Sequence, residues 1–320
     1  MSIFSSSTAF GPVPSRRLGM SMGINNIPSK ICSYACIYCQ VGQTTLLQKN
    51  RCEFFKPEKI LRDVQKRLAK TTKSGVKTDY LAFVPDGEPT LDINLGKTID
   101  LLKPLGIPIA VITNSSLMWR TDVREELARA DWVSLKIDAF DDRTWRRINR
   151  PEVFLQLQPM HGGMLEFTKH FSGKLVTETM LIKNKNESDD RLRELADFIA
   201  ELAPHTAYLS IPTRPPLEKW AAKPDEDRLN RAFQIYSANL PRVEYLIGYE
   251  GNAFACTGDA EKDLLNITAV HPMRKSAVEK LLLKANEPWA LVDRLIDAGD
   301  IKESMYEGHE YYLRTFGLVQ

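Results

Sequence analysis

The chain has 320 residues, of which 43% are hydrophobic and 26% charged, and its formal net charge is +2. These values are ordinary for a soluble globular protein and give no electrostatic reason to expect a nucleic acid or a membrane as partner. No run reaches the roughly 18 apolar residues of a membrane span, and the N-terminus lacks the features of a signal peptide. Five cysteines, three of them in one loop, favour a reducing compartment over a disulfide framework. We therefore expect a cytoplasmic protein.

Strand-like and helix-like segments alternate up to about residue 250. Strands are predicted at 20–24, 80–84, 107–113, 132–137, 175–182 and 208–211, and helices at 57–68, at 93–102, after an N-cap at Thr121 and after an N-cap at Ser188. Such alternation gives parallel strands joined by crossover helices. About six units, against the eight of a complete TIM barrel, predict an α/β fold: a partial (β/α)6 TIM-like barrel with its site at the carboxyl ends of the strands.

The last 60 residues differ in pattern. Helices are predicted at 272–285 and 289–299, and a hairpin at 301–316 that turns at Glu307 and Gly308. Because two helices followed by a hairpin resemble a winged helix, we divide the chain into a barrel, 1–260, and a small winged-helix-like domain, 261–320. From Asn266 to Gln320, seven basic residues stand against eight acidic ones. Phosphate binding needs a positive surface, so this balance disfavours DNA binding by the tail. A tail that binds a peptide or packs on the barrel fits better.

Three cysteines stand in the spacing C-x3-C-x2-C at Cys32, Cys36 and Cys39, with Tyr38 before the last. A loop this tight can turn three thiolates inward, and thiolates suit iron–sulfur centres or zinc. On a four-iron cluster, three thiolates leave one iron open to a small molecule. The alternatives are three buried cysteines without a role and a zinc site completed by a histidine. No histidine lies near the loop in sequence, which favours the cluster.

Polar residues follow three of the predicted strands. The segment 86–89, Asp-Gly-Glu-Pro, can turn backbone carbonyls toward a ligand, and Glu88 can hold a cationic amine. Asn114 ends the next strand, where it can bind hydroxyls or a carboxylate. Ser134, Lys136 and Asp138 follow at period two on the third, offering a cation for a carboxylate and an acid for a ribose. An ordinary turn, a helix cap and a structural salt bridge are the respective alternatives.

Three further groups of side chains have less specific predictions. Arg16 and Arg17 precede the first strand and are expected at the barrel mouth, whereas Glu178 and Met180 share one face of the fifth strand and are expected in the lumen. Four arginines between 143 and 150 fall near helical spacing and can grip a phosphate or carboxylate, but a solvated helix face is the favoured interpretation.

The cysteine spacing and the 86–89 segment together resemble the signature of the radical S-adenosylmethionine (SAM) superfamily. That resemblance implies a radical SAM type of partial barrel, a [4Fe-4S] cluster on Cys32, Cys36 and Cys39, and SAM chelating the open iron. An electron from reduced flavodoxin or ferredoxin would split SAM into methionine and a 5′-deoxyadenosyl radical. Asp86 stands where this superfamily usually has a glycine. The implied contacts to SAM are Tyr38, Gly87, Glu88, Asn114, Ser134, Lys136 and Asp138.

Further segments resemble one radical SAM group, related to the wyosine-tRNA (4-demethylwyosine) synthase. They are residues 10–19, the loop end 39–42 and the winged-helix tail. That synthase is thought to use a lysine for pyruvate and a second cluster, whereas only Cys52 and Cys256 remain here, too few for one. The expected function is SAM cleavage acting on an unidentified substrate: an RNA base, a peptide or a small metabolite. The alternatives are a tRNA-modifying enzyme akin to the synthase and a non-catalytic metal-cluster regulator that binds nucleic acid through its winged helix.

Overall fold

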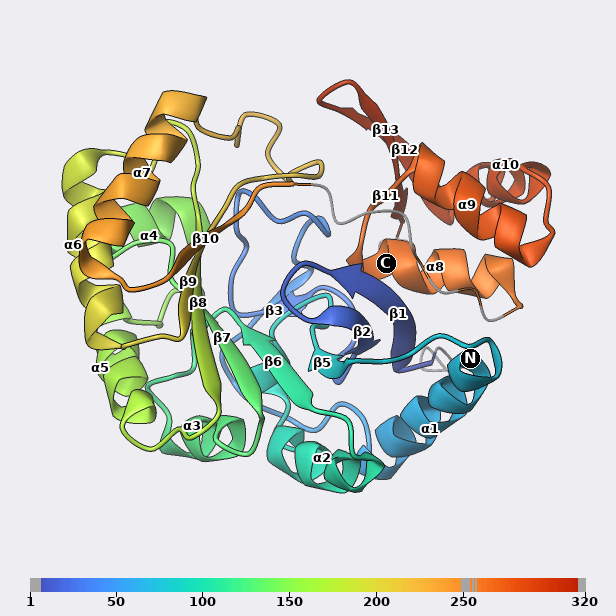
Figure 1. Ribbon diagram of the computed structural model, residues 1–320, viewed down its shortest axis with the longest axis horizontal. Coiled ribbons are helices and arrows are strands. Elements are labelled where there is room, and N and C mark those ends of the chain that lie inside the picture. The colour runs from blue at the N-terminus through green and yellow to red at the C-terminus, as the bar shows by residue number, and fades with distance from the viewer. Residues whose placement is uncertain (1–6, 249–253, 255, 257, 316–320) are drawn as a thin grey trace.

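A curved eight-stranded sheet forms the centre of the computed structural model, which describes residues 7–248, 254, 256 and 258–315 (Figure 1). The strand order is β1-β2-β5-β6-β7-β8-β9-β10, parallel from β2 onward, with β1 antiparallel to β2. The predicted α/β class and parallel sheet are confirmed. The bounds are β1 Ala9–Ser15, β2 Gly19–Ile24, β5 Tyr80–Phe83, β6 Ile109–Thr113, β7 Trp132–Lys136, β8 Lys174–Met180, β9 Thr206–Ser210 and β10 Val243–Leu246.

Helices cover the outer side of this sheet (Figure 1). Helix α1 shows why they form: Pro57 occupies its first turn, and Ile60 and Val64 fall at helical spacing and are buried. Within the described residues, no helix has both the length and the apolar character needed to cross a membrane. The bounds are α1 Pro57–Lys73, α2 Leu95–Leu102, α3 Thr121–Leu127, α4 Asp142–Asn149, α5 Leu157–Thr168, α6 Asp189–Glu201 and α7 Glu226–Asn239, with short 3-10 helices η1 at Pro89–Leu91 and η2 at Lys103–Leu105.

Two strands and one cap differ from the prediction. Strand β1 contains Gly11, Pro12 and Pro14, which depress strand propensity, but it lies at the sheet edge, where proline is tolerated. Strand β10 is only four residues long and adds a parallel strand after the six that were predicted. The predicted cap Thr121 is the first helical residue of α3, and Arg120 holds the N-cap position without a side-chain bond.

The C-terminal segment, residues 258–315, has its own small sheet. Its order is helix, short strand, two helices and two strands, and the sheet order is β11-β13-β12. The predicted helix start at 272 is wrong, because Met273 and Arg274 pair with β13 instead. The predicted turn is confirmed, with positive φ angles at Glu307 and Gly308. The winged-helix identity and the domain division stay predictions. The bounds are α8 Ala260–Val270, β11 Met273–Arg274, α9 Lys275–Ala285, α10 Ala290–Asp297, β12 Ile301–Tyr306 and β13 His309–Arg314.

This C-terminal segment packs on the edge of the barrel, with α8 beside β1 (Figure 1). Phe10 and Val13 of β1 belong to the apolar core of the segment. A buried arginine, Arg67 of α1, donates to the carbonyl of Gly11 at 2.6 Å and pairs with Asp263 of α8 at 2.9 Å. The segment therefore covers an edge strand that would otherwise present unpaired backbone groups.

Candidate cluster and cofactor site

The three-cysteine loop lies at the carboxyl edge of the sheet. It begins in β3 (Ile31–Cys32), which pairs in parallel with β4 (Leu46–Leu47). On one side, the Lys30 amide donates to the carbonyl of Asp86 at 2.7 Å; on the other, the amide of Ile37 donates to the carbonyl of Ile148 at 2.9 Å. Backbone bonds therefore hold the loop between the turn after β5 and the end of α4.

The thiols of Cys32, Cys36 and Cys39 are free and partly exposed. Side-chain amides face two of the sulfurs: Asn114 Nδ2 lies 3.5 Å from Cys32 Sγ, and Asn149 Nδ2 lies 3.6 Å from Cys36 Sγ. Burial raises the pKa of Cys36 to about 12, and burial likewise raises the pKa of Cys32 and of Cys39. The thiols therefore favour the protonated form, and a positive centre such as a metal would be needed to hold them as thiolates.

This donor set fits an iron–sulfur cluster. Cysteine is the usual ligand of such clusters, and N–H groups directed at the sulfurs are the usual surroundings. Among the residues that the structure describes, no three His, Cys, Asp or Glu side chains converge where one metal ion would sit. The thiolates of a cubane bind different irons and need not converge, so this finding bears on the zinc alternative and leaves the cluster as the better fit.

Gly87 brings the turn after β5 against the cysteine loop through a parallel bridge to Ile31. Its φ is +156°, and an added Cβ would lie 1.9 Å from the Ile31 carbonyl oxygen and 2.8 Å from Ile27 Cδ1. Only glycine fits there. Asp86 keeps the turn closed, because its buried carboxylate pairs with Lys30 Nζ at 2.8 Å. Burial raises the pKa of Asp86 to about 6, although Lys30 opposes this shift.

Glu88 is buried, and its carboxylate accepts hydrogen bonds from neutral groups. The donors are the amide and hydroxyl of Thr90 (3.0 and 2.6 Å), the hydroxyl of Thr113 (2.6 Å) and the amide of Asn114 (2.7 Å). Burial raises its pKa, which these bonds only partly offset. Glu88 thus joins the turn after β5 to the end of β6, and its contact with the SAM amine stays a prediction.

Asp138, like Glu88, joins separate segments of the chain by accepting hydrogen bonds. Its carboxylate accepts from the Tyr38 hydroxyl, from Asn149 Nδ2 at 2.7 Å and from the Met180 amide at 2.8 Å. Asp138 thereby fixes Tyr38, which lies within the cysteine loop, and Asn149, which lies beside it. Ser134 Oγ is buried and has no hydrogen-bond partner among the described residues. The predicted contacts of Asp138 and Ser134 with SAM stay predictions.

Lys136 ends β7 and lies over the ring of Tyr38, with Nζ 5.1 Å from the ring centroid. Its ammonium group pairs with Glu178 at 3.1 Å. Burial alone would lower the pKa of Lys136, but the charges of Glu178 and Asp138 raise it overall. Glu178 shows the reverse: burial would raise its pKa, but Lys136 and Arg17 lower it to about 2. Both groups are therefore charged near neutral pH.

A cavity of about 210 Å³ opens beside Lys136. The expectation that Arg16, Arg17, Glu178 and Met180 lie at the barrel mouth and lumen is confirmed, since all four line it. Sequence reasoning missed the residues that follow β9, because nothing in their pattern marks a ligand site. The lining comprises Arg16, Arg17, Tyr38, Gln40, Lys136, Glu178, Met180, Ser210, Ile211, Thr213, Arg214 and Leu246.

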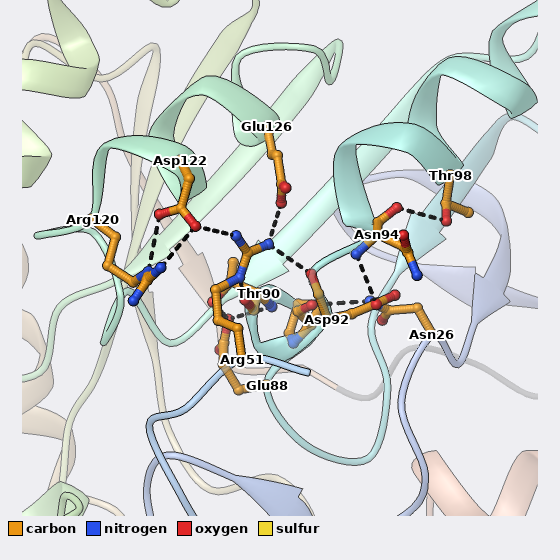
Figure 2. Close-up of polar contacts among 11 residues, drawn as sticks. Asn26, Arg51, Glu88, Thr90, Asp92, Asn94, Thr98, Arg120, Asp122 and Glu126 are labelled. Carbon is orange, nitrogen blue, oxygen red and sulfur yellow. Dashed lines mark hydrogen bonds and ion pairs between the residues drawn. The ribbon is translucent and has the colours of Figure 1, made fainter. Parts of the chain in front are cut away.

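Arg51 was also missed, and it organises the other side of the site (Figure 2). Its guanidinium donates to the carbonyls of Thr90 (2.8 Å) and Asp92 (2.7 Å) and pairs with Asp122 (2.7 Å) and Glu126 of α3. This network ties the segment after the cysteine loop to η1. A lone arginine beside Cys52 carries no sequence signal for it. The predicted solvated face of α4 is confirmed, since its arginines, Arg143, Arg146 and Arg147, and Arg150 at its C-cap are exposed.

A partial barrel of parallel strands with a three-cysteine loop at its carboxyl edge defines the class: an iron–sulfur α/β-barrel protein. The family description "Radical SAM superfamily" matches residues 26–199, and the chain belongs to this superfamily. It is thus an enzyme whose reaction class is open, and membership implies an iron–sulfur cluster and SAM as cofactors. The non-catalytic alternative is not supported.

The chain is also similar to curated proteins and to solved structures. The chain is 42% identical over 309 residues to the UPF0026 protein MJ1312 of Methanocaldococcus jannaschii, covering 96% of each. It is 33% identical over 239 residues to a UPF0026 protein of Helicobacter pylori, covering 73% of this chain and 76% of that one. Among solved structures, TYW1 with a lysine-pyruvate adduct bound has a TM-score of 0.54 at 18% identity, covering 69% of this chain and 74% of that chain. At that identity the likeness concerns the fold alone.

Proposed function

We propose that this enzyme reductively cleaves SAM at a [4Fe-4S] cluster to form a 5′-deoxyadenosyl radical that acts on a substrate still to be identified. One observation carries the proposal: three free cysteines stand together at the carboxyl edge of the sheet, with two asparagine amides directed at their sulfurs. Family membership adds the expectation of both cofactors.

Residues of the chain itself would bind and orient these cofactors. Cys32, Cys36 and Cys39 would hold three irons. Asn114 and Asn149 would donate N–H groups to the sulfurs and so stabilise negative charge on them. When bound, the cluster and SAM supply the electron transfer that breaks a sulfur–carbon bond. The rest of the protein orients the reactants and excludes water.

SAM would lie between the turn after β5 and the end of β7. The backbone at Gly87 comes against the cysteine loop and supports a contact with the SAM amine. The Ser134 hydroxyl is buried and has no hydrogen-bond partner among the described residues, which supports a contact with SAM. Lys136 is charged and supports a contact with the carboxylate. Reduced flavodoxin or ferredoxin would supply the electron.

The tRNA-modifying alternative is the weaker one. A lysine that forms an adduct with a carbonyl compound must be neutral when it attacks. Lys136 is the lysine among the described residues that line the cavity, and it could form such an adduct. Its ion pair with Glu178, however, keeps it protonated. The likeness to TYW1 extends to the fold, not to a substrate. The substrate therefore stays open among an RNA base, a peptide and a small metabolite.

The test is to purify the protein without oxygen, reconstitute it with iron and sulfide, and measure 5′-deoxyadenosine after adding dithionite and SAM. We expect about four irons per chain and 5′-deoxyadenosine in the wild type, and loss of both when Cys32, Cys36 and Cys39 are replaced by alanine. Cys52→Ala is the matched control, because Cys52 is exposed. A fully loaded cluster that neither binds nor cleaves SAM would refute the proposal.

A further inference from the structure

We propose that residues 212–223, which we call the strap, position the cysteine loop around the cluster, and that the C-terminal hairpin, β12 and β13, anchors the strap. The strap joins β9 to α7 (Figure 1). This inference rests on the proposed function, because it needs a cluster on the cysteine loop. It gives the C-terminal segment a part in shielding that cluster from water and oxygen.

The strap has little structure of its own. All twelve of its residues are described, none lies in a helix or strand, and three of them, Pro212, Pro215 and Pro216, are prolines. Proline has no backbone N–H to donate, so such a segment cannot fix itself through a backbone ladder. The position of the strap therefore comes from contacts with neighbouring parts of the chain.

The middle of the strap packs on the cysteine loop at Ile37, the residue after Cys36. The amide of Glu218 donates to the Ile37 carbonyl at 2.9 Å. Ala221 is buried in the same apolar cluster as Ile37, and Cys36 packs against that cluster. Since the amide of Ile37 donates to the Ile148 carbonyl of α4, the strap and α4 hold this residue from both sides.

Arg150, which follows α4, joins the cysteine loop to the strap. Its carbonyl accepts from the amide of Ala35 at 3.1 Å, and its guanidinium pairs with Glu218 at 2.5 Å. The residue before it, Asn149, directs its side-chain amide at Cys36 Sγ. Two consecutive residues therefore contact the loop, one cysteine sulfur and the strap.

The C-terminal hairpin holds the strap at both of its ends. At the start of the strap, two tyrosine hydroxyls of the hairpin donate to backbone carbonyls at 3.0 Å each: Tyr306 to Pro212 and Tyr311 to Thr213. At the end of the strap, Lys223 pairs with Glu307 at 2.9 Å. The hairpin thus reaches the cysteine loop through the strap, although it lies more than 250 residues away from that loop in sequence.

These contacts bear on the chemistry of a bound cluster. Hydrogen bonds to the sulfurs and exposure to water set the reduction potential of an iron–sulfur cluster. When the strap is released, the loop between Cys36 and Cys39 opens more often, and water and oxygen reach the cluster. Water stabilises the more negative, reduced cluster, so the reduction potential would become more positive.

Two measurements on the reconstituted holoenzyme without SAM test the inference: the rate at which air bleaches the visible absorbance of the cluster, and its midpoint potential. We expect Tyr306→Phe combined with Tyr311→Phe to bleach about two- to fivefold faster than wild type, with a more positive potential. Tyr312→Phe is the matched control, because its hydroxyl bonds to Glu303 and Glu310 within the same small sheet. Thermal unfolding establishes that each variant is folded.

A second pair of variants tests the contact with the loop directly. Glu218→Pro removes the amide that donates to Ile37, whereas Glu218→Gln keeps this amide and removes only the charge that pairs with Arg150. We expect Glu218→Pro to bleach about two- to tenfold faster than Glu218→Gln.

Two results would overturn the inference: the double tyrosine variant matches Tyr312→Phe in both bleaching rate and potential, or Glu218→Pro matches Glu218→Gln. The same preparations are then assayed for 5′-deoxyadenosine, which separates the two proposals. The expected bleaching rates without SAM cleavage would refute the proposed function alone. SAM cleavage by wild type, with strap variants as resistant to air as their controls, would refute this inference alone.

Discussion

Two buried glutamates at the carboxyl edge of the same sheet have opposite surroundings. Glu88, beside the cysteine loop, accepts hydrogen bonds from neutral hydroxyls and amides, and its pKa is raised by burial. Glu178, beside the cavity, faces Arg17 and Lys136, which lower its pKa to about 2 against the effect of burial. Within one barrel, one buried glutamate is therefore held by neutral donors and the other by cations.

The difference separates the site into two regions. On the Glu88 side, neutral donors and a glycine fix the backbone around the cysteine loop, and the nearby cations Lys30 and Arg51 pair with other carboxylates, those of Asp86, Asp122 and Glu126. On the Glu178 side, the cations Arg17 and Lys136 pair with one carboxylate at the lining of a cavity. The first region fixes the backbone through hydrogen bonds to neutral groups, and the second fixes side chains through ion pairs.

Gly87→Ala would break the first region with the largest effect. The new Cβ would meet the Ile31 carbonyl oxygen at 1.9 Å, so the bridge to the cysteine loop must open. We expect a loss of about 3–5 kcal/mol in the free energy of unfolding, together with reduced iron content. Urea denaturation and iron analysis measure both. Gly106→Ala is the control: its φ is also positive, at +69°, but nothing lies within 4 Å. Equal losses in the two variants would contradict the role of the close contact.

Glu178→Gln would break the second region. It leaves Arg17 and Lys136 near one another without their shared carboxylate, and we expect a loss of about 2–4 kcal/mol at pH 7. Because the pKa of Glu178 is lowered to about 2, this stabilisation is present above the usual carboxyl range near 4.5 and is lost as the pH falls toward 2. The difference between wild type and variant should therefore shrink in acid. Glu58→Gln, from an exposed pair with Lys97, is the control and should change stability little.

Asp92→Asn would sharpen the comparison through the opposite pH dependence. Asp92 belongs to the Glu88 side, and burial raises its pKa to about 7 despite bonds from Asn94 and Asn26 (Figure 2). The folded protein therefore binds a proton that the unfolded chain releases, and stability falls as the pH rises from about 4 to about 7. We expect the variant to lose most of this pH-dependent change in unfolding free energy. If Asp92→Asn keeps the wild-type dependence of unfolding free energy on pH, Asp92 is not the source of that dependence.

Tyr311→Phe has the smallest expected effect. It removes the hydrogen bond to the Thr213 carbonyl and should cost about 0.5–1.5 kcal/mol in thermal unfolding. Tyr245→Phe is the control, since its hydroxyl bonds at 3.4 Å, outside the cavity lining. An equal loss of stability in both variants would argue against a contribution from the hydrogen bond to the Thr213 carbonyl.

The parallel sheet was predictable because its strands are apolar runs rich in β-branched residues, such as Ile109–Thr113. Strand β1 was not, because its two prolines and glycine oppose strand propensity, and the covering segment lies some 250 residues away in sequence. Packing against the C-terminal segment stabilises β1, and the local sequence of β1 gives no sign of that packing.

The candidate site follows the same division. Cysteine spacing is local, so Cys32, Cys36 and Cys39 were predicted as a set. The part played by Arg51 depends on carbonyls at η1 and on acids of α3, and the position of the segment after β9 depends on a hairpin near the C-terminus. The sequence marked Glu88 as important, but not that its carboxylate would bond to the neighbouring strand. Contacts that close over long sequence distances were the ones missed.

Arg67 has a consequence for how this protein can vary among relatives. Its guanidinium joins α1, the Gly11 carbonyl and Asp263 of α8 within a buried contact. A change at Asp263 would leave a buried cation with less compensation, and a change at Arg67 would do the same to a carboxylate. The two positions are thus expected to change together or not at all. A chimaera that takes its barrel from one lineage and its C-terminal segment from another would fold only if both parents share this pair. The barrel and the C-terminal segment are therefore expected to be inherited together.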